Sequence, residues 1–235
     1  RPDQAADVNP LPDSPATKDW WPFQPEYKPH EAPVLDFAFL NDPVGAHGFV
    51  TMKNGDLFFA DGTPVRFWGT NASYWGGQMI YMEKLDADRY ADFLARRGVN
   101  CVRIHVLHST NSLMDTSRDD TQHMDPMKLD RLEYLLYALS KRGIYVNVDL
   151  MYHRMFGEGD GIDPELIRPE RGNRDGDYNV SWAAGAAAFW HPRAIELNLA
   201  FYRNFLTHVN PYTGKALVDS PQMAMVTVNN EQSIF

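Results

Sequence analysis

Cysteine is nearly absent from this chain of 235 residues: it occurs once, as Cys101. A single cysteine excludes a disulfide within the chain. Cys101 lies inside Val99–Val106, a run whose composition is typical of a buried strand. We therefore expect a buried structural thiol at this position rather than a nucleophile.

Positive charge is scarce and long apolar runs are missing. The chain carries 22 Lys and Arg residues against 31 Asp and Glu, which gives a formal net charge of −9. This excess of negative charge argues against nucleic acid and anionic membranes as partners. No segment approaches the ~20 apolar residues that cross a bilayer. The composition suits an enzyme that acts on neutral molecules.

Two further signals are missing from the sequence. The chain starts at Arg1 without an initiator Met or a signal sequence. We expect a removed targeting segment or a trimmed start, and we predict an extracellular or periplasmic location, that of a secreted protein. In addition, no glycine-rich phosphate loop follows the first predicted strand, and a dinucleotide-binding fold requires one.

Aromatic residues, in contrast, are plentiful. They make up 13% of the chain and include six Trp. Such enrichment often accompanies the stacking of aromatic rings on sugars, and it also accompanies a large aromatic core. Composition alone leaves both interpretations open.

The start of the chain differs in composition from the rest. Residues 1–47 are rich in Pro, Asp and Ala, which predicts an extended N-terminal arm anchored by aromatic residues. From Gly48 on, Asn54-Gly55 and Asp61-Gly62 separate apolar β-formers. These turn dipeptides predict a β-hairpin that leads into a strand at Val65–Gly69.

The remaining sequence alternates between helical and strand patterns, and two of the helices end in Arg-Gly, at Gly98 and Gly143. We expect the first helix to be capped by Asp86, and the second to carry the leucine stripe Leu129–Leu139. The other predicted elements are the strands Val99–Val106, Ile144–Leu150 and Met223–Asn229 and a helix over Pro192–His208.

This order predicts an α/β fold with parallel strands buried under helices. A (β/α)8 TIM barrel and a doubly wound open sheet both fit. The missing phosphate loop and the polar residues after each strand favour the barrel, whose active site lies at the carboxyl ends of its strands. Only the first four strands are present, so residues 48–235 are expected to be the N-terminal half of a barrel that needs its C-terminal half as a partner.

Polar and aromatic residues collect at the ends of the predicted strands, where they could converge on one cleft. They are Trp68, Asn71 and Trp75 after the first strand; Arg103, His105 and His108 on or after the second; Asp149, Tyr152 and His153 after the third; and Asn230 and Glu231 after the fourth. A glycosidase needs such a set: one carboxylic acid protonates the leaving oxygen, while a second carboxylate is the nucleophile or activates water. An arginine beside the nucleophile keeps that carboxylate ionised.

The sequence resembles the clan A glycoside hydrolases, and within them family 5, which includes cellulases and mannanases. The resemblance covers roughly Gly48 to Phe235. It rests on Asp61-Gly-Thr-Pro-Val-Arg-Phe-Trp-Gly-Thr-Asn71, Gly98-Val-Asn-Cys-Val-Arg-Ile104 and Val228-Asn-Asn-Glu231.

The resemblance implies roles for individual residues. Glu231 would be the general acid/base, Asn230 the contact to the sugar 2-hydroxyl, and Arg103 the support of the nucleophile. The family's histidine after the third strand would be His153, although the family spacing is Asp-x-His and here four positions separate Asp149 from His153. His105 or His108 is the alternative.

The function that follows is that of a retaining β-glycosidase acting on a neutral β-linked polysaccharide or oligosaccharide. The family's nucleophilic glutamate lies on the seventh strand, beyond this chain, so we expect the 235-residue chain alone to be inactive. By the same resemblance the reaction needs no metal and no cofactor.

Other interpretations stay open at this point. Trp182 and Trp190 either stack on sugar rings or pack the segment between them onto the barrel. The acidic stretches 117–121, 158–163 and 173–178 are predicted to be solvated loops, because they lack the sixth-position glycine and closing glutamate of an EF-hand. The segment Met151–His191 is long enough to predict functional loops.

Two alternative functions remain. One is a metal-dependent TIM-barrel hydrolase that uses His105, His108, Asp149, His153 and Glu231. Histidines three apart on a strand lie on opposite faces, which disfavours this metal site. The other is a non-catalytic carbohydrate-binding half-barrel in which Trp68, Trp75, Trp182 and Trp190 contact the glycan.

Overall fold

The structure is a computed structural model of the whole chain. It describes residues 35–73, 79–105, 113–151, 154, 156–163 and 189–230. All of these residues belong to one compact unit. None of the helices in these ranges is long and apolar enough to cross a membrane.

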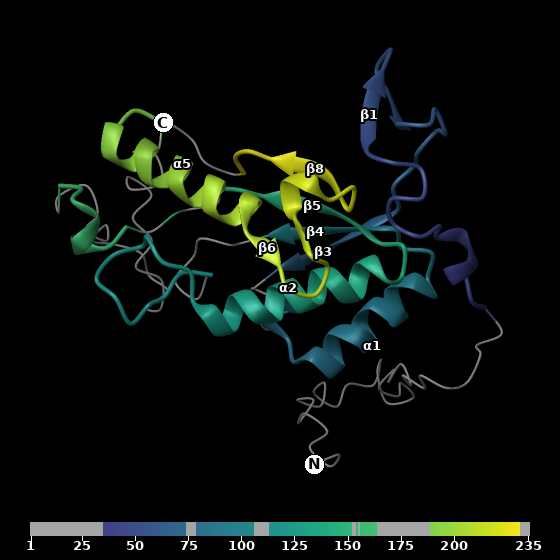
Figure 1. The fold of residues 1–235 in the computed structure, drawn as a ribbon, viewed down its shortest axis with the longest axis horizontal. Helices are drawn as coiled ribbons and strands as arrows, with labels where there is room; N and C mark the ends of the chain where they lie inside the picture. Colours follow the sequence, from purple (N-terminus) through teal and green to yellow (C-terminus); the bar gives the residue numbers. More distant parts are fainter. Residues whose placement is uncertain are drawn as a thin grey trace, which may run out of the picture. The chain divides into compact units, whose positions relative to one another are not determined.

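The centre of the fold is a four-stranded parallel sheet (Figure 1). Its strands are β3 (Gly69–Ser73), β4 (Cys101–His105), β5 (Tyr145–Asp149) and β8 (Met223–Thr227), and they lie side by side in chain order. This confirms the prediction of four successive parallel strands. Neighbouring strands in chain order are the arrangement at the start of a (β/α)8 barrel.

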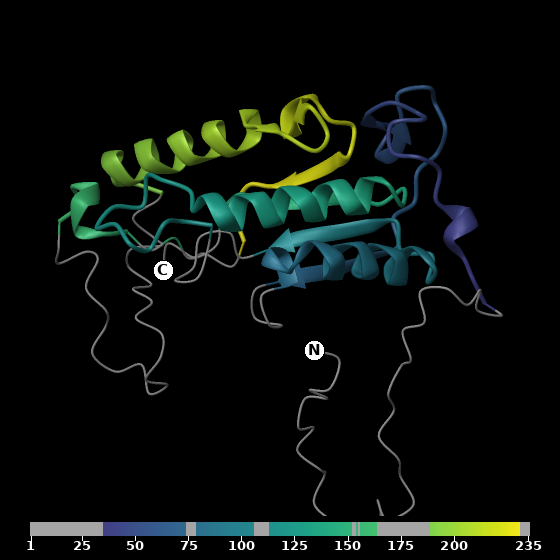
Figure 2. The same cartoon turned by 60° about the horizontal axis from the view of Figure 1, so that its bottom comes forward.

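Three long helices connect the strands: α1 (Lys84–Ala95), α2 (Pro126–Ser140) and α5 (Pro192–Thr207). Figures 1 and 2 show all three on one face of the sheet. Local sequence sets their starts. The Asp125 side chain accepts hydrogen bonds from the backbone N–H groups of Met127 and Lys128, and α2 and α5 both begin with proline, which is favoured in the first turn.

Alternation along the strands sorts apolar from polar side chains. Val102, Ile104, Val146 and Val148 are completely buried and belong to the core that packs under the helices. The residues between them, among them Arg103, point to the other face because side chains alternate along a strand. The sheet therefore has an apolar face toward the helices and a polar face opposite it.

A β-hairpin precedes the sheet in the chain. Strand β1 (Val50–Lys53) pairs antiparallel with β2 (Asp56–Phe59), and the turn residues Asn54 and Gly55 both have positive φ. Positive φ at both positions is what an Asn-Gly turn provides. The predicted hairpin is thus confirmed.

Residues just before the hairpin pack at the amino ends of the strands. After the short helix η1 (Ala38–Leu40), the Asn41 side chain donates hydrogen bonds to the carbonyls of Val99 and Arg142. A side chain on Gly143 would meet the Asp42 carbonyl at 2.5 Å, so only glycine fits there. The part of residues 1–47 that the structure describes is therefore held against the sheet by specific contacts.

Two predicted boundaries are wrong. The first parallel strand runs over Gly69–Ser73 and not over Val65–Gly69. The cap of α1 is Glu83, and Asp86 lies inside the first turn. The remaining short elements are the hairpin β6 (Val209–Asn210) and β7 (Lys215–Ala216) and the 3-10 turns η3 (Met79–Tyr81), η4 (Glu158–Asp160) and η5 (Leu217–Asp219).

The packing of α2 predicts a pH-dependent stability. Burial, with a smaller contribution from the charge of Asp130, raises the pKa of Glu133 to about 7. Because the folded protein then holds a proton that the unfolded chain releases near its ordinary pKa of 4.5, the free energy of unfolding falls as pH rises from about 4.5 to about 7. We expect Glu133→Gln to be more stable than the parent protein at pH 8 by about 2–3 kcal/mol.

Urea unfolding of the two proteins at pH 5 and pH 8 measures this difference, which should be small at pH 5. The ring nearest to this carboxylate is that of His208, whose Nε2 lies 3.1 Å from Glu133 Oε1. His208→Ala therefore serves as the control, and it should retain the pH dependence. An equal gain from Glu133→Gln at both pH values would contradict burial as the cause.

Candidate active site

An ion pair between neighbouring strands lies on the polar face of the sheet. Arg103 of β4 donates from Nε to Asp149 Oδ1 at 3.1 Å and from Nη2 to Oδ2 at 2.5 Å. Asp149, the last residue of β5, is only 1% exposed. Burial acts to raise the pKa of Asp149, but hydrogen bonds from His105 and Arg103 outweigh it and hold this pKa below its ordinary value.

His105 joins the same carboxylate. Its Nδ1 lies 2.5 Å from Asp149 Oδ2, and the ring is buried at the carboxyl end of β4. An ionised carboxylate only accepts hydrogen bonds, so Nδ1 must carry the proton. The contact with Asp149 thus sets the tautomer of His105.

Asn230 completes the cluster. Arg103 Nη2 also donates to Asn230 Oδ1 at 2.6 Å, while the backbone N–H of Asn230 donates to the Met151 carbonyl at 3.0 Å. The side-chain Nδ2 of Asn230 is buried and has no hydrogen-bond partner in the part of the chain that the structure describes. A buried amide donor without a partner is costly unless a ligand or water satisfies it.

The cluster is suited to binding a neutral, oxygen-rich molecule. The positive charge of Arg103 is balanced by Asp149. The amide donor of Asn230 is held in place but has no hydrogen-bond partner among the described residues. Asn71 lies opposite Arg103 in the pairing of β3 with β4 and extends this polar layer. Hydroxyl groups of a sugar match such donors and acceptors.

The structure describes only some of the predicted site residues. Arg103, His105, Asn71 and Asn230 lie at or near the carboxyl half of the strands, and the first three occupy the same face. Trp190 lies directly before α5, is 56% exposed and contacts the ring of His191 edge to face. Six predicted residues lie outside the described residues: Trp75, His108, Tyr152, His153, Trp182 and Glu231.

The predicted position of Trp68 is wrong. Because β3 starts at Gly69, Trp68 precedes the strand and lies at its amino end, where its backbone N–H donates to Asn100 Oδ1. It is 70% exposed and lies at the opposite edge of the sheet from Asn230. We therefore assign it no role in binding substrate.

The sequence predicts that Asp149 converges with Arg103 and His105 at one cleft, but it assigns Asp149 no role in cleaving a glycoside and does not identify its partner. The available signal was Arg103 itself: a charged side chain inside a barrel needs a charged partner. Asp149 is that partner, on the adjacent strand. Which carboxylate pairs with an arginine depends on the register between strands, and a single sequence does not display this register.

The described residues offer little for metal or thiol chemistry. No group of three His, Cys, Asp or Glu side chains within the described ranges lies close enough to hold a metal ion. Of the residues in the metal hypothesis, only His105 and Asp149 are described. Burial raises the pKa of Cys101 to about 11, which confirms a buried thiol that is not activated.

In the acidic loops, residues 117–119, Glu158 and Asp163 are exposed as predicted, the stretch 173–178 lies outside the described residues, and one aspartate departs from the prediction. Asp160 was expected in a solvated loop but is wholly buried, where it accepts hydrogen bonds from the backbone N–H groups of Thr121 and Gly157. At Gly157, a side chain would meet the Asp119 carbonyl at 2.0 Å. These loops therefore pack directly against each other.

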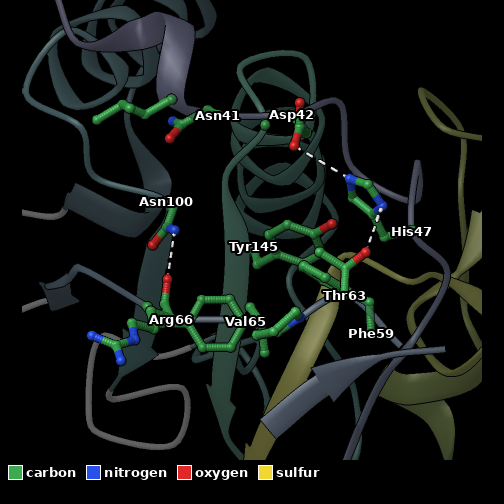
Figure 3. A pocket seen from close by; sticks show the side chains of 13 residues that line it. Asn41, Asp42, His47, Phe59, Thr63, Val65, Arg66, Asn100 and Tyr145 are labelled. Carbon is green, nitrogen blue, oxygen red and sulfur yellow. Dashed lines mark hydrogen bonds and ion pairs between the residues drawn. The ribbon is translucent and has the colours of Figure 1, made fainter. Parts of the chain in front are cut away.

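A separate cavity of about 190 Å³ lies at the amino edge of the sheet (Figure 3). Figure 3 shows His47 between Asp42 and Thr63, with Tyr145 beside them. Hydrogen bonds to Asp61 and Asp42 raise the pKa of His47. Barrel enzymes build their active sites at the carboxyl ends of the strands. We therefore do not include this cavity, which lies at the amino ends, in the candidate active site.

Comparison of the sequence alone gives no relatives: no protein-family model matches it, and no curated protein is significantly similar. Solved structures do match. A glycoside hydrolase family 5 mannosidase from Rhizomucor miehei, in complex with mannosyl-fructose, superposes with a TM-score of 0.59 at 16% identity, over 79% of this chain and 49% of that one.

A second structure agrees with the first. The endo-1,4-beta-mannanase from Rhizomucor miehei superposes with a TM-score of 0.57 at 18% identity, over 78% of this chain and 48% of that one. The chain has the fold of half a family 5 glycoside hydrolase barrel. It spans about half the length of these two structures, which confirms the prediction of a four-stranded fragment of a TIM barrel.

Proposed function

We propose that this chain supplies the first four strands of a retaining β-glycosidase that acts on a neutral β-linked polysaccharide or oligosaccharide. The observation that carries the proposal is the contact of Arg103 with both Asp149 and Asn230 at the carboxyl edge of a family 5-like sheet. Asn230 directly precedes Glu231 in the chain, so the contact fixes the backbone just before the proposed acid.

Each residue has a role in this proposal. Glu231 is the general acid/base, which protonates the leaving oxygen and then removes a proton from water. Asn230 donates from Nδ2 to the sugar 2-hydroxyl, a contact that gains strength in the transition state. Arg103 supports the nucleophilic carboxylate, which comes from the C-terminal half of the barrel, outside these 235 residues.

We propose β-1,4-mannan as the first substrate to test and β-1,4-glucan as the second. The support for mannan comes from the two structures compared above, of which one is a mannanase and the other a mannosidase. A polymer of this size does not cross a membrane, so this proposal includes an extracellular or periplasmic location. The reaction uses two carboxylates, and the proposal includes no metal or cofactor.

The test is hydrolysis by the complete product of the gene that encodes this chain. We expect it to release soluble sugars from β-1,4-mannan or β-1,4-glucan, and proton NMR should show the β-anomer as the first product, since retention follows from two successive displacements. The 235-residue chain alone should show no turnover.

Two outcomes would contradict the proposal. Formation of the α-anomer first would indicate an inverting enzyme, in which the second carboxylate activates water. Binding of glycans without any hydrolysis would favour the non-catalytic carbohydrate-binding alternative, to which the exposed Trp190 would contribute an aromatic surface.

A further inference from the structure

We propose that Asp149 is a positioning residue, which orients the Asn230 amide through Arg103 and fixes the tautomer of His105 without contacting the substrate. This inference rests on the proposed function for its meaning in catalysis. Its structural content is independent of any substrate, because it concerns contacts among four side chains of the chain itself.

The first step is the burial of the carboxylate. The Asp149 side chain has no exposed surface, whereas Arg103 is 31% exposed. Asp149 therefore lies behind Arg103 and His105, and both reach toward it from β4. A buried carboxylate with charged and hydrogen-bonded partners is rigid, because any movement leaves a charge unpaired.

The second step is the transfer of this rigidity to Asn230. Arg103 donates from Nε and Nη2 to the two oxygens of Asp149. This pair of parallel hydrogen bonds, the Arg103 fork, fixes the plane of the guanidinium. The same Nη2 donates to Asn230 Oδ1. Because a guanidinium only donates, the oxygen of the amide must face Arg103, and the NH2 group must face away from it.

The contact with Arg103 decides which atom of the Asn230 amide is available to a ligand. With its oxygen held by Arg103, Asn230 presents Nδ2, which has no partner among the described residues, as a donor. A flipped amide would present an acceptor instead and would set two donors, Nη2 and Nδ2, against each other. Asp149 thus determines whether Asn230 can donate to a sugar oxygen.

The third step concerns His105. The contact of Nδ1 with Asp149 Oδ2 places the proton on Nδ1 and leaves Nε2 as the acceptor of the ring. An asparagine at position 149 has a single oxygen, which cannot serve the Arg103 fork and His105 together. In Asp149→Asn, at least one donor therefore faces another donor.

The first experiment is a double-mutant cycle in the complete gene product, with Asp149→Asn and Asn230→Ala. If Asp149 acts through Asn230, each single variant lowers kcat on the glycan by at least about 10-fold, and the double variant is no slower than Asn230→Ala alone. KM should change less than kcat, since the contact to Asn230 strengthens in the transition state. Fully additive losses would overturn the proposal.

A matched control comes from the same strand. Asn147 lies two residues before Asp149 on the same face of β5, and it accepts a hydrogen bond from Thr227. It is the register partner of Arg103 on β4, but no hydrogen bond joins its side chain to Arg103 or Asn230 among the described residues, so the loss caused by Asn147→Ala should add to that of Asn230→Ala. Non-additivity of this pair as well would indicate a general disturbance of the sheet.

The second experiment needs no activity. Nitrogen-15 NMR of labelled histidine should show His105 as a single Nδ1–H tautomer in the parent protein and a shift away from it in Asp149→Asn. If Asp149→Asn does not fold, Arg103→Lys breaks the fork from its other end and should leave the tautomer unchanged. An unchanged tautomer in folded Asp149→Asn, together with additive losses in the mutant cycle, would overturn the proposal.

The two experiments separate this inference from the proposed function. A gene product that hydrolyses no glycan while His105 responds to Asp149→Asn would remove the proposed function and retain the positioning role. Full glycosidase activity together with an unchanged His105 tautomer and additive losses would retain the proposed function and remove the positioning role.

Discussion

Replacement of Glu231 by Gln should lower kcat on a β-linked glycan by about 10²–10⁴-fold in the complete gene product, the range that general acid–base catalysis contributes. Glutamine keeps the size and the hydrogen-bonding capacity of the side chain but has no proton to give to the leaving oxygen. Binding of the glycan, measured by calorimetry, should remain close to that of the parent protein.

The leaving group provides a sharper test of this role. An aryl glycoside whose phenol is acidic departs without protonation, so Glu231→Gln should form the glycosyl-enzyme at nearly the parent rate. The second step still needs a base to activate water, so the intermediate should accumulate and give a burst of phenol. Equal losses on the glycan and on the aryl glycoside would contradict the assignment of Glu231.

A control with the same substitution is available on α5. Glu196 is 67% exposed and pairs with Arg193 on the helix surface. Glu196→Gln removes a carboxylate of the same type away from the proposed cleft, and it should retain parent activity on both substrates. A similar loss in this variant would show that the effect of Glu231→Gln is not local.

The helices could be predicted well because their signals are local. The predicted helix Pro192–His208 is observed as Pro192–Thr207, and the stripe Leu129–Leu139 lies within α2. Proline at the first helical position and glycine after the last turn act within a few residues. Such signals do not depend on how the rest of the chain packs.

Strand β3 shows the limit of this reasoning. Its sequence, Gly-Thr-Asn-Ala-Ser, has little intrinsic preference for a strand, whereas Val65–Trp68 looks more strand-like. Pairing with β4, about thirty positions later in the chain, decides where β3 lies. The misplacement of Trp68 follows from this one boundary, because a shift of four residues moved it to the other end of the sheet.

The candidate site was predictable in its residue types but not in its pairing. Alternation along β4 places Cys101, Arg103 and His105 on one face, which the sequence displays directly. The convergence of Arg103 and His105 on one oxygen of Asp149 depends on the register of β4 against β5. Hydrogen bonds between residues more than forty positions apart have no local signature.

The loops were the least predictable part. Acidic stretches are usually solvated, and nothing near Asp160 in the sequence indicates that it is buried. Its burial depends on Thr121, whose hydroxyl donates to Asp160 Oδ2 at 2.7 Å and accepts from Arg154 Nη2 at 3.1 Å. Arg154 therefore joins loops that follow two different strands.

Loss of this arginine is the second large effect that we predict. Arg154 is 1% exposed and donates hydrogen bonds to the Thr121 carbonyl, the Leu197 carbonyl and Asn198 Oδ1. Burial lowers its pKa to about 10, which still leaves it charged at neutral pH. Arg154→Met fills similar volume but leaves these acceptors buried without donors, so we expect a loss of about 3–5 kcal/mol in the free energy of unfolding.

The same substitution on the protein surface isolates the contribution of burial. Arg89 is 49% exposed and pairs with Asp86 one turn earlier in α1. Arg89→Met should cost less than about 1 kcal/mol, because exposed ion pairs contribute little. Urea unfolding of both variants and the parent at pH 7 measures the two losses. A difference between them of less than about 1 kcal/mol would mean that water, and not Arg154, satisfies the carbonyls where the loops meet α5.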